Sequence, residues 1–441
     1  MKQPAVVFWF TIFLLSFRVS LGGERHPGET VPRDSGGRQA PEIGADSSLE
    51  DYLRYAALEN AGLKAAFNRW KAALERVPQV GALPDPRFTY TFFVEEVETR
   101  VGPQRQKFGL TQAFPWFGKL DARKDAASEA AAAAGEAYRT ARLALFYRVK
   151  SAYHDYWYLA RAIDLTRQHI MLMKNLEGVA RTRFKTGVAP NSAVIQAQVE
   201  LAKLDDRLRS REALREAIVA RLNAAMNRPA GRPLPWPRLL PESDAALTDG
   251  EAAQWLAEGN PELRRLDRLS AAEEAGIRLA RKEYFPDIRL GVGYVQTDDA
   301  LAPGTPDSGK DPVTATVSIN LPIWYGKQRA AGREARLRQA AAESKRDDTA
   351  ARLAADLQLA LYHFRDAERK IDLYGDTLVP KAEQSLKVAQ QGFEAGTATF
   401  LSLIDAERLL LEFELDRARA RAERGTRLAE IEMLVGRDIA Q

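Results

Sequence analysis

Cysteine is absent from this sequence of 441 residues, and its absence excludes several kinds of function. Disulfide bonds, zinc sites built on cysteine, thiol catalysis and a lipid anchor on cysteine all require that residue. Histidine is scarce as well, with four residues, and the sequence contains no nucleophile elbow, phosphate-binding loop or dinucleotide-binding fingerprint. We therefore expect that the protein is not an enzyme and that it carries no cofactor or metal ion.

An excess of charge of one sign is also missing. The sequence has 64 basic and 60 acidic residues, which gives a formal net charge of +4. Proteins that bind nucleic acid need a concentrated basic surface. The composition therefore gives no reason to expect a nucleic-acid partner.

Long apolar runs are missing except near the N-terminus. Lys2 precedes an apolar run over residues 5–17, and the small residues Ser20 and Gly22 follow it. The run is shorter than the roughly 20 residues of a membrane-spanning helix, so this pattern predicts a cleaved signal peptide over residues 1–22 in preference to a membrane anchor. Residues 23–48, rich in Gly, Pro, Arg and Asp, predict a disordered segment. With no later apolar run, a mature chain that spans a membrane would do so as a closed β-barrel.

The rest of the chain is an internal duplication. Stretches that begin at Asn60, Pro86, Pro115, Arg183 and Leu222 return in the same order, at a nearly constant offset, at Asn260, Pro286, Pro322, Gly392 and Ile431. An ordered set of matches at one offset indicates two structural repeats. We expect them over residues 49–228 and 249–436, with a linker at 229–248 and a C-terminal tail at 437–441.

Each repeat has the same predicted order of elements. A helix over residues 49–77 or 250–283, ended by a proline, leads into a strand pair at 86–114 or 286–322. Then follow proline-free stretches rich in Ala, Arg, Leu, Glu and Lys, from Lys119 to Lys185 and from Lys327 to Val379. Such composition is typical of very long helices, which need partners along their length. We therefore expect two long helical hairpins with tips near residues 187 and 396.

The predicted strands alternate between apolar and polar side chains. The apolar positions include four that we expect to face lipid, namely Leu290, Val292, Val317 and Ile319. Alternation over about 9–11 residues fits a transmembrane strand, although a soluble hairpin with one face on a core fits the strands equally well. The long polar connection over residues 297–312 favours the transmembrane arrangement, in which one side has long loops.

Aromatic pairs end the second strand of each predicted pair: Trp116 with Phe117, and Trp324 with Tyr325. Aromatic side chains at this place suit the belt where a membrane meets water. Ordinary packing of aromatic residues in a protein core is the alternative.

The duplication, the four strands and the two turn sequences RFKTGVAPNSAVIQAQ (183–198) and GFEAGTATFLSLIDAE (392–407) resemble the TolC-type outer-membrane efflux proteins. The resemblance implies a mainly α-helical homotrimer with a β-barrel part. Each protomer would give four strands to a 12-stranded barrel among the lipids of the outer membrane of a Gram-negative-type cell. Its helical hairpins would form a long periplasmic α-barrel. Four strands cannot close a barrel alone, which independently requires oligomerisation.

The resemblance also implies partners and site residues. Proteins of this kind are passive exit ducts that work with a periplasmic adaptor and an inner-membrane transporter. The hairpin tips that would meet the adaptor are Gly187, Val188, Gly396 and Thr397. Rings of aspartate close the periplasmic mouth in the family. Asp405 falls on one such position, Ser402 stands at the other, and Gln196 is the first-repeat equivalent of Asp405.

Other interpretations remain open from the sequence. A periplasmic coiled-coil scaffold outside any membrane would explain the helices but not the strand pairs. Within the same fold, the PWFGK motif at Pro115 resembles the heavy-metal branch, and the exported cargo could be a metal ion, a drug or a protein. His169, Met171 and Met173 could bind a soft cation, but a methionine-containing helix seam is the favoured interpretation.

Overall fold

The computed structural model describes residues 42–240 and 247–439. The predicted signal peptide, most of the predicted disordered segment and the end of the predicted tail lie outside the described residues. Within the described ranges, no helix combines the length and the apolarity that crossing a membrane requires.

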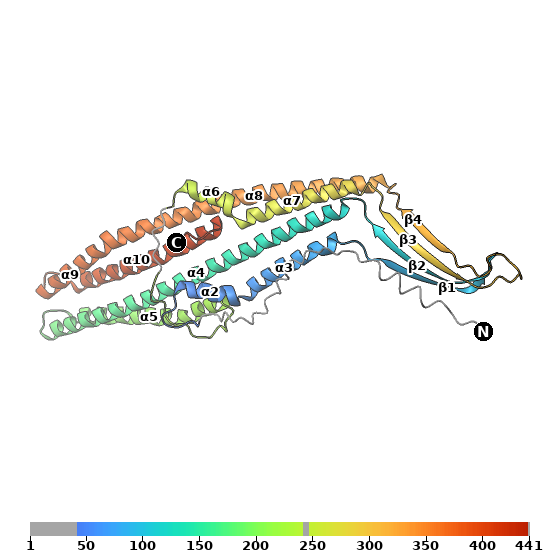
Figure 1. Cartoon of the computed structure of the whole chain (residues 1–441). Coiled ribbons are helices and arrows are strands. Elements are labelled where there is room, and N and C mark those ends of the chain that lie inside the picture. Colours follow the sequence, from blue (N-terminus) through green and yellow to red (C-terminus); the bar gives the residue numbers. More distant parts are fainter. Residues whose placement is uncertain (1–41, 241–246, 440–441) are drawn as a thin grey trace. The chain divides into compact units, whose positions relative to one another are not determined.

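The two repeats share one order of elements (Figure 1). The first contains α2 (Leu49–Glu59), α3 (Ala61–Gly81), β1 (Arg87–Val97), β2 (Gln104–Phe114), α4 (Lys119–Lys185) and α5 (Asn191–Ala225). The second contains α6 (Asp249–Gly259), α7 (Pro261–Lys282), β3 (Ile288–Thr297), β4 (Val313–Ile319), α8 (Tyr325–Asp372), the π-helical turn η1 (Leu373–Leu378), α9 (Val379–Ala395) and α10 (Phe400–Val435).

The single helix predicted at the start of each repeat is wrong, because an asparagine divides it. Asn60 has extended backbone between α2 and α3; its Oδ1 accepts a hydrogen bond from Leu63 N (2.9 Å), and its Nδ2 donates to Ala225 O (2.8 Å). Asn260 caps α7 in the same way and donates to Leu434 O at 2.7 Å. An asparagine side chain that bonds nearby backbone competes with helix continuation and favours a helix start.

The predicted end of the first helix at Pro78 is wrong, and a helical leg of the second repeat also continues past a proline. Pro78 does not end the first helix, since α3 continues to Gly81. A proline so close to a helix end costs the helix one backbone hydrogen bond, the one that its missing N–H would have donated to the carbonyl four residues earlier. In the second repeat, Pro380 stands at the start of α9, directly after η1. The wider π-helical turn carries the helix past this proline, so the leg begun by α8 continues to Ala395.

The last residues of the predicted disordered segment are ordered. Ser48 and Asp51 form a capping box at the start of α2, and Ile43 packs against the core formed by α2, α4 and α5. This contact gives residues 42–48 a fixed place, which their composition alone did not indicate.

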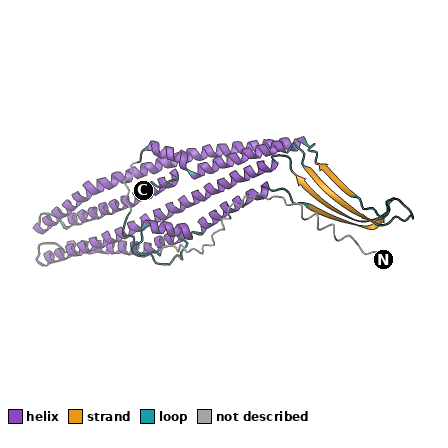
Figure 2. Cartoon of the chain, in the orientation of Figure 1, coloured by secondary structure: helices purple, strands orange, loops and turns teal. Residues whose placement is uncertain are grey.

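The four strands form one antiparallel sheet in the order β1-β2-β3-β4 (Figure 2). The two predicted strand pairs are therefore joined through β2 and β3, which pair along ten positions from Gln104–Thr297 to Phe114–Ile288. β1 and β4 are the edge strands. Each leaves one row of backbone hydrogen-bonding groups without a strand partner among the described residues.

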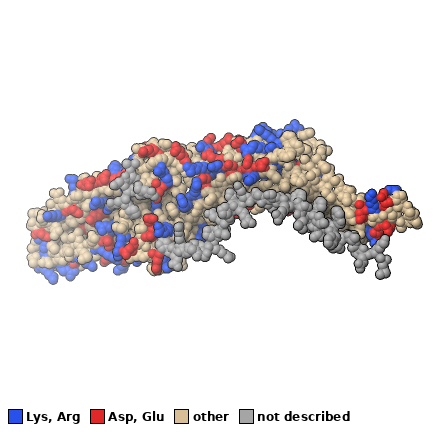
Figure 3. All heavy atoms as spheres, viewed as in Figure 1, with Lys and Arg blue, Asp and Glu red and all other residues tan. Residues whose placement is uncertain are grey.

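The helices pack in pairs along their length. α4 contacts α3, α5, α7 and α10, while α8 contacts α7 and α10. Two equivalent cores lie where the short helices meet the long ones: α2 against α4 and α5, and α6 against α8 and α10. A third core joins the hairpins, with Met173 of α4 and Leu411 of α10 among its buried members. Figure 3 shows mixed acidic and basic residues along the helices and an uncharged stretch over the strands.

Candidate functional site

The sheet has one apolar face that is exposed in the protomer. Besides Gln106, Gln112 and Gln296, the register places on it the apolar and aromatic residues Phe88, Tyr90, Phe92, Phe108, Leu110, Ile288, Leu290, Val292, Tyr294, Val313, Val317 and Ile319. The four positions predicted to face lipid share this face: Leu290 pairs with Val317, and Ile319 with Ile288. Val317 is 71% exposed. So large an exposed apolar surface marks a contact with lipid or with another protein.

The opposite face is small, polar and basic. It carries Arg87, Thr89, Thr91, Lys107, Gly109, Thr111, Ala113, Arg289, Gly291, Gly293, Thr314, Thr316 and Ser318, and one larger apolar residue, Val295, which is buried. Three of these, Arg87, Lys107 and Arg289, are exposed cations. The continuously paired part of the sheet, which the structure describes in full, contains no acidic residue. The sheet therefore separates an apolar surface from a cationic one. The alternation of residues predicted an apolar and a polar face, but it did not predict the positive charge of the polar face.

The predicted interfacial aromatics lie where β2 and β4 lead into the helices. Trp116 stacks on Phe285, with ring centroids 5.3 Å apart and planes at 7°. Phe117, Trp324 and Tyr325 are exposed, and Tyr325 also stacks on Tyr284 at 6.3 Å. Three of the four rings are therefore available to a membrane or a neighbouring chain, while Trp116 is used within the protomer.

An ion pair between a buried lysine and a partly exposed aspartate lies beside Trp116. The Lys119 side chain is 1% exposed, and its Nζ lies 2.8 Å from Asp287 Oδ1 and 3.0 Å from Phe285 O. Asp287 also accepts a hydrogen bond from Trp116 N at 2.9 Å. These contacts join the end of β2 to the start of β3. The sequence pattern places Lys119 at the start of a long helix but does not reveal its partner.

The predicted hairpin tips are exposed and adjacent. Gly187 and Gly396 have left-handed backbone, with φ of 74° and 78°, which glycine adopts without strain. Val188 and Thr397 follow them and are exposed. Arg183 joins the two tips: its guanidinium donates to Glu394 O and lies 5.2 Å from the centre of the Phe393 ring. The sequence analysis missed Arg183, because nothing in the repeat marks a contact between the hairpins.

Both tips line one groove of about 330 Å³. Its walls include Arg183, Val188, Gln196 and Gly396, whereas Ser402 and Asp405 do not line it. The structure thus brings Gln196 together with the tips. The other two predicted gate residues lie outside this groove.

The predicted gate residues occupy equivalent positions at the helix starts. Gln196 and Asp405 are each the sixth residue of α5 and α10 and are both exposed. Ser402 makes a hydrogen bond within its own chain, in which its Oγ donates to Thr399 O at 2.7 Å. Asp405 is paired as well, since Arg408 Nη1 lies 3.3 Å from its Oδ1. Asp405 is therefore an exposed carboxylate with a cation already beside it.

Arg408 also binds a buried carboxylate, a contact that the sequence analysis missed. Its Nη2 donates to the buried carboxylate of Glu200 on α5. Burial raises the pKa of Glu200, but the hydrogen bond and charge of Arg408 outweigh burial, and the net pKa is lowered. Arg408 thus links α5, near the first tip, to Asp405, near the second.

His169 does not form a soft-cation site with the two methionines. Its Nδ1 lies 2.8 Å from Glu407 Oε1 and its Nε2 2.7 Å from Glu414 Oε2. Met173 is buried in the core between the hairpins, whereas Met171 is 68% exposed. No metal-binding group of three His, Asp or Glu residues was found within the described ranges. The structure therefore fits the seam interpretation for Met173, and His169 acts as a bridge from α4 to α10.

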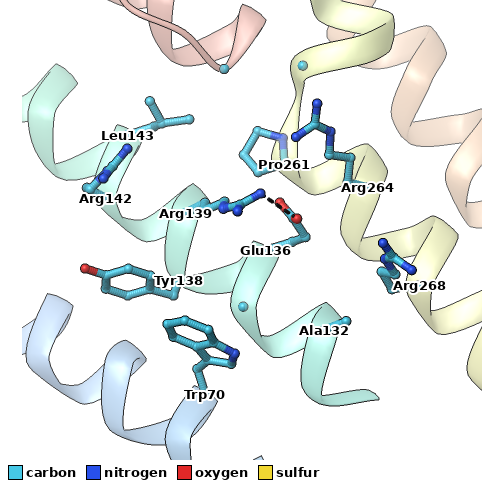
Figure 4. Close-up of a pocket in the computed structure, with 13 residues that line it drawn as sticks. Trp70, Ala132, Glu136, Tyr138, Arg139, Arg142, Leu143, Pro261, Arg264 and Arg268 are labelled. Carbon is cyan, nitrogen blue, oxygen red and sulfur yellow. Dashed lines mark hydrogen bonds and ion pairs between the residues drawn. The ribbon is translucent and has the colours of Figure 1, made fainter. Parts of the chain in front are cut away.

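A cavity of about 580 Å³ lies between α3, α4 and α7 (Figure 4). Three of its four arginines have acceptors: Arg139 pairs with Glu136 at 2.8 Å, Arg268 with Glu129 at 3.1 Å, and Arg264 donates to Glu258 O at 2.7 Å. The Arg268–Glu129 pair joins α7 to α4, and we assign the cavity no ligand.

The family of the chain follows from its match to a sequence model. The model described as outer membrane efflux protein matches residues 53–228 and 253–437, one match for each repeat. The chain belongs to the outer membrane efflux protein family. The resemblance to TolC-type proteins that the turn sequences indicated is thereby confirmed.

Individual relatives agree with this family. The chain is 27% identical over 307 residues to the outer membrane protein OprJ of Pseudomonas aeruginosa, covering 66% of this chain and 61% of that protein. It is 26% identical over 309 residues to the toluene efflux pump outer membrane protein TtgF of Pseudomonas putida, covering 68% and 62%. The matched region thus spans about three fifths of the length of these relatives.

Solved structures show the same fold. The outer membrane protein VceC of Vibrio cholerae aligns with a TM-score of 0.72 at 18% identity, covering 89% of this chain and 96% of that one. A structure of CusC aligns with a TM-score of 0.74 at 17% identity, covering 88% and 92%. The predicted fold class, mainly α-helical with a strand part built from a duplicated unit, is confirmed.

Proposed function

We propose that this protein is the outer-membrane channel subunit of a tripartite efflux system. The observation that carries the proposal is the two-faced sheet: an exposed apolar face backed by a polar, cationic one, joined to long paired helices. An outward apolar face and an inward polar face are what a transmembrane β-barrel requires. The duct is passive, and the chain performs no enzymatic reaction.

The protomer acts as one third of a closed barrel. Its four strands leave β1 and β4 as edges, and an open sheet edge in lipid would leave backbone groups without hydrogen bonds. A homotrimer of twelve strands removes both edges and gives a lumen lined by the polar face. The helical hairpins of three chains would then continue the duct into the periplasm, with Trp116, Phe117, Trp324 and Tyr325 near the membrane surface.

The partners are a periplasmic adaptor and an inner-membrane transporter. The relative TtgF is by name part of an efflux pump, which supports such partners here. The adaptor would meet the exposed tips at Gly187, Val188, Gly396 and Thr397. Gln196, Ser402 and Asp405 would lie at the periplasmic mouth. The two family matches support our repeat boundaries of 49–228 and 249–436.

The scaffold alternative accounts less well for the strands. A periplasmic scaffold would have to keep the exposed apolar face in water, at a cost of roughly 25 cal/mol for each Å². Extraction separates the two functions. A barrel should leave the membrane fraction only with detergent, run as a trimer by mass and form conducting channels in a planar bilayer. Release by high salt as a stable monomer without conductance would refute the proposed channel.

A further inference from the structure

The two strand pairs are equivalent in register as well as in sequence. Leu-Pro-Asp at residues 83–85 precedes β1, and Phe-Pro-Asp at 285–287 precedes β3. This alignment is shifted by two residues from the match of Pro86 with Pro286, and in it Phe88 corresponds to Leu290, because each lies three residues after the aspartate. Phe88 pairs with Leu110, and Leu290 pairs with Val317. The next pair on the same face agrees: Tyr90 with Phe108 matches Val292 with Ala315.

The seam between β2 and β3 is complete within the protomer. Besides the strand pairing, it has the Lys119–Asp287 ion pair and the stack of Trp116 on Phe285. Lys119 and Trp116 follow β2, whereas Asp287 and Phe285 precede β3. The seam therefore joins the end of one strand pair to the start of the next.

The same four positions recur at the sheet edges, where their side chains have no counterpart to bind among the described residues. Lys327 corresponds to Lys119, and Trp324 to Trp116; both follow β4. Asp85 and Leu83, the counterparts of Asp287 and Phe285, precede β1. Trp324 is 75% and Leu83 50% exposed. Lys327 and Asp85 are exposed as well, and no ion pair or hydrogen bond of either side chain occurs in the described part of the chain.

Closure of the proposed trimeric barrel places β4 of one protomer beside β1 of a second copy of this chain. We propose that in this seam Lys327 binds Asp85 of the partner subunit and Trp324 packs on Leu83 of the partner subunit, as Lys119 binds Asp287 and Trp116 packs on Phe285. β1 and β4 are opposite edges of one four-stranded sheet, which cannot close on itself, so the missing half of each contact comes from another chain. The inference rests on the proposed barrel and adds its subunit contact.

The repeat also fixes the register of this seam. Within the protomer, Leu110 pairs with Val292 and Gln112 with Leu290. The equivalent positions place Val317 opposite Tyr90 of the partner subunit and Ile319 opposite Phe88 of the partner subunit. All of these lie on the apolar face, so the lipid-facing surface continues across the seam without a step.

Cross-linking tests the seam cleanly, because the natural chain has no cysteine. Full-length protein carrying both Asp85→Cys and Lys327→Cys is purified in detergent, oxidised and run on a denaturing gel. We expect covalent dimers and trimers. A second pair, Val317→Cys with Tyr90→Cys, is joined by a short thiol cross-linker and should give the same ladder of covalent dimers and trimers. It replaces the first pair if those substitutions disturb assembly.

Two matched controls define the specificity. Lys119→Cys with Asp287→Cys should cross-link inside one chain and leave a band of monomer mass. Val317→Cys with Thr91→Cys places the thiols on opposite faces and should give no ladder. A charge exchange adds an independent measure: Asp85→Lys and Lys327→Asp should each lower the melting temperature of the trimer, and the double variant should restore it.

The outcomes distinguish this inference from the proposed function. Monomer bands alone from both intersubunit pairs, with a wild-type protein that still conducts and is trimeric by mass, would overturn the seam and leave the channel intact. A monomeric wild type without conductance would refute the channel itself. Ladders from both pairs together with charge-exchange rescue would establish the subunit contact.

Discussion

A carboxylate binds each ring nitrogen of His169, and these contacts make the stability of the fold depend on pH. Burial alone would lower its pKa, but the hydrogen bonds and charges of Glu407 and Glu414 outweigh burial and raise the pKa to about 9. The ordinary pKa in an unfolded chain is about 6.5. The imidazolium therefore stabilises the fold fully below about pH 6.5. That contribution is lost as the pH rises through about 9.

We predict that the melting temperature falls between pH 7 and pH 10 and that His169→Gln flattens this dependence. Removing one member of a buried pair typically costs about 3–5 kcal/mol, so the variant should also be less stable at pH 7. Thermal unfolding of the detergent-solubilised protein measures both effects. His363→Gln, on α8, is the matched control and should keep the wild-type slope. An unchanged slope in His169→Gln would contradict the bridge.

At the scale of the elements, the two faces of the sheet should respond differently to charge. Val317→Arg or Leu290→Arg should cost about 2–4 kcal/mol near the bilayer midplane. Thr316→Arg or Ser318→Arg places the cation on the polar face and should cost much less. Unfolding by urea in lipid vesicles gives the free energies. Equal losses on both faces would refute the orientation of the sheet.

The cationic face should also influence which ions pass. Arg87, Lys107 and Arg289 are the charged residues of the continuously paired sheet, and three protomers would bring nine such cations to one lumen. Rings of basic side chains favour anions. Replacing all three with glutamine should therefore lower the chloride-to-potassium permeability ratio, read from the reversal potential in a KCl gradient.

The charge-conserving variant Arg87→Lys, Lys107→Arg, Arg289→Lys is the control for that measurement. It should keep the ratio of the wild type, since the charge and the face are unchanged. If both triple variants shift the ratio equally, the cause is pore shape and not charge.

Periodicity and repetition were enough to predict most elements. The long helix from Lys119 to Lys185 and the alternating strands follow from composition and period two, which are local properties of the chain. The breaks at Asn60 and Asn260 were missed because each depends on a carbonyl more than 160 residues away. The contacts of Arg183, His169 and Arg408 likewise join separate hairpins, and no local pattern encodes them.

At the scale of the whole molecule, the exposed hairpin tips should decide whether the adaptor binds. Val188 is 61% exposed and follows Gly187. A charge there should oppose burial in an adaptor contact. Val188→Asp should therefore abolish co-purification of the adaptor and export, while the trimer mass stays the same. Leu239→Asp is the control, since Leu239 is also exposed but lies in the linker between the repeats. Export that survives Val188→Asp would place the dock elsewhere.

The ion pair between Asp405 and Arg408 changes the charge expected at the predicted gate. Three copies of Asp405 around a threefold axis would form a carboxylate ring, and Arg408 beside each one offsets part of its charge. Because Arg408 is also held by the buried Glu200, the cation should remain in place when the Asp405 charge is removed. Like charges in a ring repel one another, so this offset also makes a narrow mouth easier to hold closed.

Two substitutions should consequently act in opposite directions. Asp405→Asn removes the carboxylate ring while Glu200 still holds Arg408, and it should weaken cation selectivity and block by divalent cations from the periplasmic side. Arg408→Gln exposes the full charge of the ring and should strengthen both. Single-channel recordings in a planar bilayer, with trimer mass confirmed for each variant, measure these changes. Shifts of the same sign, or no shift in either variant, would mean that Asp405 faces away from the pore.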